Sequence, residues 1–168
     1  MKDYWASKIR VLYIEDSKIY YNPLVYEFKK IPYVNVNHIK SLEEFKELKK
    51  KKFDIVLTDL NFLLLKDKPK GRKLSWPFGQ FIGIYYKFIY PELSNYVVCY
   101  SNDYNNINKT FFHKIYNKKE LNFNDFVNKL LENYNKYISN QKSYDIFDKY
   151  RSSFDDDSED DGNVYATV

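Results

Sequence analysis

Two short apolar runs that each end in carboxylates constrain the fold of this chain more than any other feature. They are VLYIEDS at residues 11–17 and FDIVLTDLN at residues 53–61. Buried parallel strands read as continuous apolar runs, and in open α/β sheets ligands bind just beyond the carboxyl ends of the strands. We therefore expect Glu15, Asp16 and Asp59 to meet at one edge of a parallel sheet.

Three carboxylates at one point require a counter-charge. Each close pair repels by about 3 kcal/mol at an effective dielectric constant of about 20, so a cation is needed to offset the cluster. Hard oxygen ligands suit Mg²⁺. The sequence thus predicts a Mg²⁺ site that includes Glu15, Asp16 and Asp59.

The remaining patterns alternate between strands and helices along the chain. Strands are predicted at residues 9–14, 33–39, 53–59, 95–101 and 110–117, and helices at 18–30, from 41, from 79 and at 122–138. Ser41 and Glu44 form a capping-box signature at the start of the second helix, and either Asn122 or Asn124 is expected to cap the last one. Such alternation predicts an α/β fold: a doubly wound, flavodoxin-like, five-stranded parallel sheet with helices on both faces.

Apolar residues mark three of the predicted helices. The first places Ile19, Leu24, Tyr26 and Phe28 among polar positions, and in the third Phe81, Ile82, Tyr85 and Phe88 or Ile89 recur at helical spacing. In the last helix the stripe is wide enough to pack on the sheet: Phe126, Val127, Leu130, Leu131, Tyr134 and Ile138.

With these residues in place, the sequence resembles the response-regulator receiver domain of two-component signalling over about residues 8–138. The resemblance implies that Asp59 accepts a phosphoryl group from a histidine kinase or phosphotransfer protein. It also implies that Mg²⁺ is held by Glu15, Asp16, Asp59 and the backbone carbonyl of Asn61. Ser101, at the end of the fourth strand, matches the residue that contacts the phosphoryl oxygens.

The sequence departs from the family's pattern after the fifth strand and after the fourth strand. The family has a Lys-Pro pair after the fifth strand, which is missing here; Lys118 fits the lysine's position best, ahead of Lys114 and then Lys119. The aromatic switch residue is either Tyr116 or Phe112. Asn102 replaces a usually small residue, which is expected to slow the entry of phosphodonors, and Asp103 matches a position that tunes the phosphoryl group's lifetime.

Two further segments are unusual. The insert at residues 61–78 is rich in both loop-forming and apolar residues. It fits equally well a tethered surface loop over the sheet and a lid that contacts a partner or covers the site. After Ser101 the chain is too polar and short for a full fourth helix, which we expect to be reduced.

We expect a receiver-like domain at residues 1–138 and an aromatic, acidic C-terminal tail at 139–168. In the tail, Tyr144, Phe147, Tyr150 and Phe154 recur at helical spacing, which fits a docking helix, although a disordered solubilising tail is preferred. The acidic run at 155–161 holds six acidic residues, so without it the net charge rises from +4 to +10.

The composition of the chain also indicates where in the cell the protein is expected to lie. The 168 residues contain no apolar stretch of membrane-spanning length and no signal-peptide pattern, so a cytoplasmic protein is expected. The single cysteine, Cys99, lies in an apolar run and reads as a core residue, and His38 and His113 read as structural or solvated.

The leading hypothesis is a stand-alone receiver that signals through protein contacts with an unknown output protein, rather than an enzyme. The alternative is a pseudo-receiver, an interaction module without efficient phosphorylation. A third hypothesis is that the basic domain binds nucleic acid and the acidic tail regulates this binding, but the sequence contains no recognisable motif for reading a nucleic-acid sequence. Neither a specific nucleic acid nor a membrane is therefore expected as a partner. Self-association as a homodimer stays open.

Overall fold

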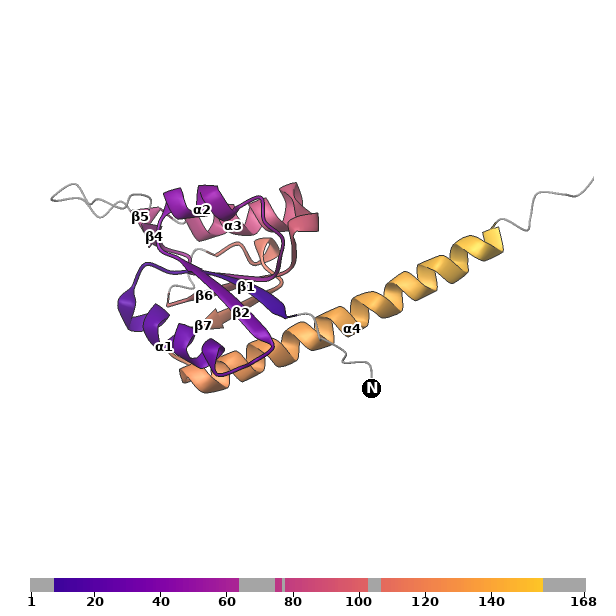
Figure 1. Cartoon of the computed structure of the whole chain (residues 1–168). Helices are drawn as coiled ribbons and strands as arrows, with labels where there is room; N and C mark the ends of the chain where they lie inside the picture. Colours follow the sequence, from indigo (N-terminus) through magenta and orange to yellow (C-terminus); the bar gives the residue numbers. More distant parts are fainter. Residues whose placement is uncertain (1–7, 64–74, 77, 103–106, 156–168) are drawn as a thin grey trace, which may run out of the picture. The chain divides into compact units, whose positions relative to one another are not determined.

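The computed structural model describes residues 8–63, 75–76, 78–102 and 107–155 (Figure 1). For residues 62–63, 75–76 and 145–155 it describes the backbone alone. The chain divides into two compact units, Met1–Glu132 and Asn133–Val168.

The first unit is built on a five-stranded parallel sheet. Its strands are β1 (Ile9–Ile14), β2 (Val34–Ile39), β3 (Phe53–Thr58), β6 (Ser94–Ser101) and β7 (Lys114–Asn117). They lie in the order β2-β1-β3-β6-β7, with every neighbouring pair parallel. The predicted sheet is therefore confirmed, and β2 is an edge strand.

The last strand is shorter than predicted. Residues Lys109–Phe111 form a 3-10 turn, η3, instead of the start of β7. Asn108 caps this turn, because its side-chain oxygen accepts a hydrogen bond from the Thr110 N–H at 3.1 Å. The chain consequently enters the sheet only at Lys114. Among the described residues between β6 and β7, η3 is the only helical turn, so the fourth helix of the predicted pattern is reduced, as expected.

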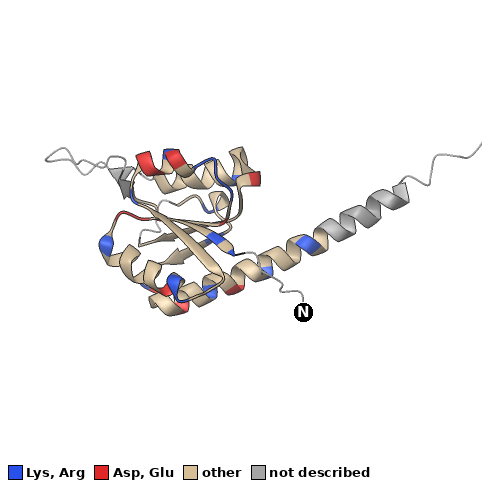
Figure 2. Ribbon diagram, viewed as in Figure 1, with Lys and Arg blue, Asp and Glu red and all other residues tan. Residues whose placement is uncertain are grey.

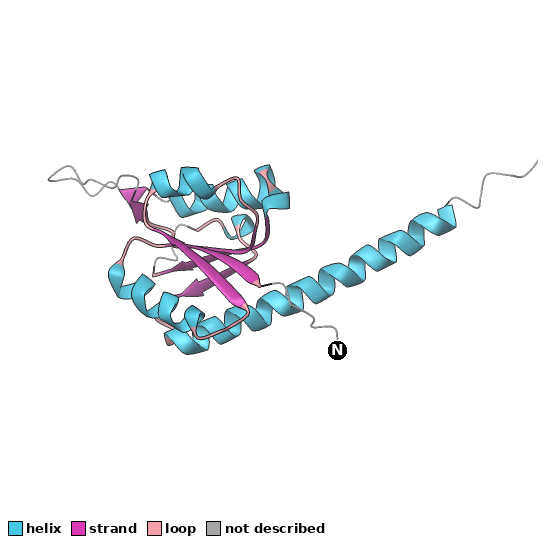
Figure 3. Ribbon diagram, viewed as in Figure 1, coloured by secondary structure: helices cyan, strands magenta, loops and turns pink. Residues whose placement is uncertain are grey.

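Helices cover both faces of the sheet (Figures 1 and 3). One face carries α1 (Lys18–Lys29) and the first turns of α4 (Phe123–Asp155); the other carries α2 (Leu42–Leu48) and α3 (Phe78–Ile84). From α3 the chain continues through a π turn, η1 (Tyr85–Ile89), and a 3-10 turn, η2 (Pro91–Leu93). The predicted doubly wound architecture is thus present.

Two predicted helix starts are confirmed by their capping contacts. The Ser41 side chain accepts a hydrogen bond from the Glu44 N–H at 3.3 Å, while Glu44 accepts one from the Lys40 N–H at 2.7 Å. Asn122 caps α4, since its side-chain oxygen accepts from the Asp125 N–H at 2.9 Å. Acidic residues begin α2 and a lysine run follows it (Figure 2), an arrangement that the helix dipole favours.

The hydrophobic core contains the strands that were predicted from apolar runs. Beneath α2 and α3, the strands contribute Leu12, Ile14, Val56, Val97 and Cys99. On the opposite face, the Tyr100 ring stacks on Phe126 of α4 with 4.0 Å between ring centroids. Cys99 is fully buried, as predicted.

The buried face of α1 includes only some of the apolar residues noted in the sequence. The buried residues are Tyr21, Leu24 and Phe28, whereas Ile19 and Tyr26 are exposed. Leu24 and Phe28, four residues apart, lie on the face of the helix that packs on the sheet.

After α3 the π turn widens the helix from Tyr85, which shifts the later residues off the expected stripe. Ile82, Tyr85 and Tyr86 are buried, whereas Phe81, Phe88 and Ile89 are exposed. The prediction for α4 holds at Phe126, Val127, Leu130 and Leu131, which are all buried.

The insert and the tail are described in part. The ends of the insert pair as two short antiparallel strands, β4 (Phe62–Leu63) and β5 (Ser75–Trp76). Residues 64–74 lie outside the described residues, so the choice between surface loop and lid stays a prediction.

The tail differs from the preferred reading. The backbone of α4 stays helical through Asp155, so Tyr144, Phe147, Tyr150 and Phe154 occupy helical positions rather than an irregular segment. Within the second unit, the Ser139 and Ser143 hydroxyls donate to the carbonyls four residues earlier, which supports the helix locally. The acidic run after Asp155 lies outside the described residues. Of the helices described, none combines the length and the apolar character needed to cross a membrane.

Candidate functional site

Three polar residues lie one position beyond the ends of three strands of the sheet, and backbone hydrogen bonds that continue the sheet hold them in place. Glu15 follows β1, Asp59 follows β3 and Lys118 follows β7. Each backbone N–H donates to a carbonyl of the adjacent strand: Glu15 to Ile39 at 3.1 Å, Asp59 to Ile14 at 2.9 Å, and Lys118 to Ser101 at 3.2 Å. The backbone positions of all three side chains are thus set by the sheet rather than by a free loop.

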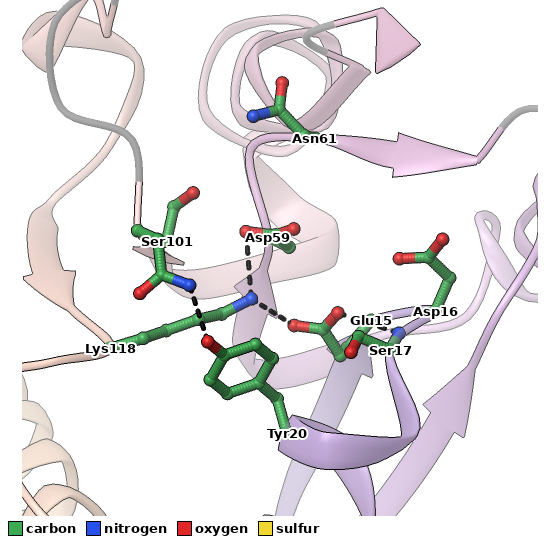
Figure 4. Close-up of a pocket in the computed structure, with 9 residues that line it drawn as sticks. Glu15, Asp16, Ser17, Tyr20, Asp59, Asn61, Ser101 and Lys118 are labelled. Carbon is green, nitrogen blue, oxygen red and sulfur yellow. Dashed lines mark hydrogen bonds and ion pairs between the residues drawn. The ribbon is translucent and has the colours of Figure 1, made fainter. Parts of the chain in front are cut away.

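These side chains open into one pocket of about 260 Å³ at the carboxyl edge of the sheet (Figure 4). Its lining consists of Glu15, Asp16, Ser17, Tyr20, Asp59, Asn61, Ser101, Asn102 and Lys118. The structure therefore brings together all six residues that the sequence nominated, although they come from four strand ends.

The acidic side chains converge as a potential metal site. Glu15, Asp16 and Asp59 each offer an oxygen, and these oxygens lie within 4.8 Å of one another. Glu15 is fully buried and Asp59 nearly so, whereas Asp16 is half-buried. A set of carboxylate oxygens alone, without nitrogen or sulfur, fits a hard divalent cation such as Mg²⁺.

Lys118 supplies the positive charge of the pocket. Its ammonium forms an ion pair with the Glu15 carboxylate and lies 3.1 Å from Asp59 Oδ1. The Lys118 side chain is buried, whereas Lys114 and Lys119 are exposed. Among the three lysines that the sequence left as candidates, Lys118 is the one that lines the pocket.

The burial of these charges changes their titration. Burial and, to a lesser extent, the neighbouring Asp59 raise the pKa of Glu15, and Lys118 opposes them, so that the pKa lies at about 7. Burial lowers the pKa of Lys118, but the attraction of Asp59 and Glu15 outweighs it, so the pKa of Lys118 is raised. Lys118 is consequently cationic at neutral pH, and Glu15 retains its proton to a higher pH than an ordinary glutamate does.

Two pocket residues, Tyr20 and Ser17, were not predicted. Tyr20 lies one turn into α1, its ring centroid is 4.3 Å from Lys118 Nζ, and its hydroxyl accepts a hydrogen bond from Asn102 Nδ2 at 2.7 Å (Figure 4). The Ser17 N–H donates to Glu15 Oε1 at 2.9 Å and orients that carboxylate. Tyr20 could have been found from its position four residues after Asp16, because one turn of helix brings a side chain back to the side on which the strand ends.

Gly79 is a third residue whose importance the sequence did not indicate. The first turn of α3 packs so closely on the segment after Asp59 that a Cβ at Gly79 would lie 2.2 Å from the Asp59 carbonyl oxygen. The Gly79 N–H donates to the Leu60 carbonyl at 3.0 Å. The absence of a side chain at Gly79 therefore permits the observed position of the Asp59 backbone.

Other nominated residues lie away from the pocket. Phe112 and Tyr116 are both buried, and neither lines the pocket, so the choice of aromatic switch stays open. Asp103 lies outside the described residues. Burial raises the pKa of Cys99 to about 12, which agrees with its predicted role as a core residue.

The two histidines make structural contacts. His38 Nε2 lies 2.8 Å from the Glu15 carbonyl oxygen, and His113 Nδ1 accepts a hydrogen bond from the Val97 N–H at 2.9 Å. Their reading as structural residues agrees with these contacts.

Comparison with known proteins identifies the fold. No protein-family model and no curated protein sequence matches the chain. A CheY-like response regulator receiver domain protein from Methanospirillum hungatei JF-1 superimposes with a TM-score of 0.59 at 14% identity, over 80% of this chain and 99% of that one.

Two further solved structures agree with it. They are the signal receiver domain of an HD domain-containing protein from Pseudomonas fluorescens Pf-5 (TM-score 0.55, 12% identity, 79% of this chain and 98% of that one) and the chemotaxis response regulator CheY4 of Vibrio cholerae (0.52, 14%, 74% and 98%). The chain therefore has the fold of response-regulator receiver domains.

Proposed function

We propose that this protein is a response-regulator receiver that accepts a phosphoryl group on Asp59 with the help of Mg²⁺. One observation carries the proposal: the Asp59 carboxylate shares a single pocket with two further acids, Glu15 and Asp16, and its Oδ1 lies 3.1 Å from the buried ammonium of Lys118. Phosphoryl transfer needs a positioned nucleophile and neutralisation of charge, and the pocket offers groups for both.

Each side chain has a task in this reaction. An Asp59 oxygen attacks the phosphorus in line, and the bond to the donor's leaving group breaks with the electron pair departing on that group. Lys118, already 3.1 Å from Asp59 Oδ1, turns to an oxygen of the transferred group, and the Ser101 hydroxyl donates to another. Asp16, Glu15, Asp59 and the Asn61 carbonyl would hold the Mg²⁺, which supplies charge neutralisation when bound.

The donor in the cell is, on this proposal, a histidine kinase or phosphotransfer protein. Phosphorylation draws Ser101 and Lys118 toward the new phosphoryl oxygens, which changes the surface next to them. The signal then passes to an output protein by direct contact. The pseudo-receiver alternative is not favoured, because a module that had lost the chemistry has no need to keep acids, hydroxyl and lysine in one pocket.

A small-molecule donor tests the proposal directly. The protein is incubated with phosphoramidate and Mg²⁺, and its intact mass is recorded over time. We expect the addition of a single, acid-labile phosphoryl group, abolished by Asp59→Asn and by chelation of the metal. Unaltered mass in the wild type at saturating donor, or equal labelling of Asp59→Asn, would contradict phosphorylation of Asp59.

A further inference from the structure

A hydrogen bond between two residues that line the pocket joins elements that are not neighbours in the sheet. Tyr20 belongs to α1, which follows β1, whereas Asn102 follows β6, and the Asn102 amide donates to the Tyr20 hydroxyl at 2.7 Å. In the sheet order, β3 lies between β1 and β6. The bridge therefore joins segments that follow the two strands on either side of β3, whose end carries Asp59, and the Tyr20 ring lies against Lys118 in the same pocket.

The exposure of the lining residues places this bridge on the solvent side. Asn102 is exposed and Tyr20 half-buried, whereas Asp59, Glu15 and Lys118 are all buried. The Tyr20 ring also lies 4.3 Å from Lys118 Nζ, so it covers the ammonium that faces Asp59 (Figure 4). A small molecule that approaches Asp59 past these residues must displace the ring or break the bridge.

We propose that the Tyr20–Asn102 bridge is a latch that controls the access of small molecules to Asp59. This inference rests on the proposed function and adds a specificity determinant to it. Two reactions pass the latch. A small donor enters and transfers its phosphoryl group to an Asp59 oxygen; later a water attacks the phosphorus, the aspartyl P–O bond breaks, and inorganic phosphate leaves. The latch slows both steps, so the protein discriminates against small donors and retains its phosphoryl group.

Tyr20→Phe is the sharpest test, because it removes the hydroxyl and keeps the ring over Lys118. Loss of one ordinary hydrogen bond shifts the opening equilibrium by about threefold to tenfold. We expect that increase both in the initial rate of labelling by phosphoramidate with Mg²⁺ and in the rate of phosphoryl loss after the donor is removed. Tyr26→Phe is the matched control, since it makes the same change on the exposed side of the same helix.

A double-mutant cycle shows whether the two residues act through their bond. Asn102→Leu keeps the approximate size of the side chain and removes the amide, so it should accelerate both rates as Tyr20→Phe does. The double variant should then be no faster than the faster single variant. Additive effects, or rates for Tyr20→Phe equal to those of wild type and Tyr26→Phe, would overturn the latch.

A chemical probe separates the latch from the proposed function. Acetylation by a small N-hydroxysuccinimide ester is followed at Lys118 by peptide mass spectrometry, with the exposed Lys119 as the internal standard. If no variant is phosphorylated, the proposed function fails, but Tyr20→Phe should still raise the Lys118 to Lys119 labelling ratio by a similar factor. An unchanged ratio would reject the latch whatever the phosphorylation assay shows.

Discussion

At the scale of single residues, the pocket combines three acids with one lysine, and this balance decides its behaviour. A buried carboxylate pair is tolerated only with a compensating charge, which Lys118 provides in the metal-free protein. Mg²⁺, when bound, would add further positive charge to the pocket. The pocket should therefore be most sensitive to the loss of Lys118 when metal is absent.

Lys118→Met removes the ammonium and retains the apolar stem. Because it leaves Glu15 and Asp59 buried without their partner, we expect the metal-free protein to lose about 3 kcal/mol of unfolding free energy. Saturating Mg²⁺ should recover part of this loss. Urea unfolding with and without Mg²⁺ measures both, and Lys119→Met, at an exposed position, serves as the control. Similar losses in the two variants would mean that Lys118 does not neutralise the acids.

The titration of Glu15 predicts an unusual pH dependence. Its pKa is raised from an ordinary 4.5 to about 7 in the folded state, so the folded protein holds a proton that the unfolded chain releases. Stability contributed by this group is present below pH 4.5 and falls as the pH rises toward 7. Glu15→Gln should flatten that fall in metal-free protein, in unfolding curves recorded between these pH values. Parallel curves for wild type and Glu15→Gln would contradict the raised pKa.

Among the elements, the contact between α3 and the segment after β3 matters most for the site. Gly79 allows the helix to start directly against the Asp59 carbonyl. On the other side of the sheet, α1 supplies the ring that covers Lys118. Helices from both faces therefore shape a pocket whose chemical groups belong to the strand ends.

Gly79→Ala distinguishes close packing from helix propensity by the sign of its effect. Propensity alone predicts a gain of about 1 kcal/mol, because alanine is the better helix former. The methyl group would meet backbone atoms 2.2 Å and 2.7 Å away, which no rotamer change relieves. We expect a net loss of about 2 kcal/mol in unfolding free energy, with weaker Mg²⁺ binding. A stabilised variant would show that this contact is not maintained in solution.

At the scale of the whole molecule, the distribution of charge predicts how strongly the protein binds nucleic acid. The acidic run at 155–161 offsets a more basic remainder, whose net charge is +10 without it. The lysines at residues 49–52 lie at the end of α2, where the helix dipole favours positive charge. Their presence is therefore explained without a surface that binds nucleic acid.

A truncation that ends before residue 155 should bind duplex DNA only weakly, without sequence preference and with a steep loss of affinity as salt rises. Gel-shift titrations of full-length and truncated protein at two salt concentrations measure this, with scrambled duplexes as controls. Tight, sequence-selective binding by the truncated form would favour the nucleic-acid hypothesis over the receiver.

The sequence by itself determined the sheet and the chemistry of its edge. Continuous apolar runs specify buried parallel strands, and a residue that ends such a run has its place set by the strand, so Glu15 and Asp59 could be placed at one edge of the sheet without any tertiary information. Ser101 was nominated by the resemblance to receiver domains. Local capping signals predicted the start at Ser41 and left Asn122 and Asn124 as alternatives for the last helix.

Tertiary structure decided what depends on contacts between distant segments. The sequence ranked Lys118 ahead of Lys114 and Lys119, and the structure decided between them, because η3 delays the last strand and leaves Lys118 directly after its end. The π turn after α3 moved Phe88 and Ile89 off the stripe that a regular helix period predicts. The approach at Gly79 and the bond between Tyr20 and Asn102 join residues far apart in the chain, and no local pattern encodes a distance between them.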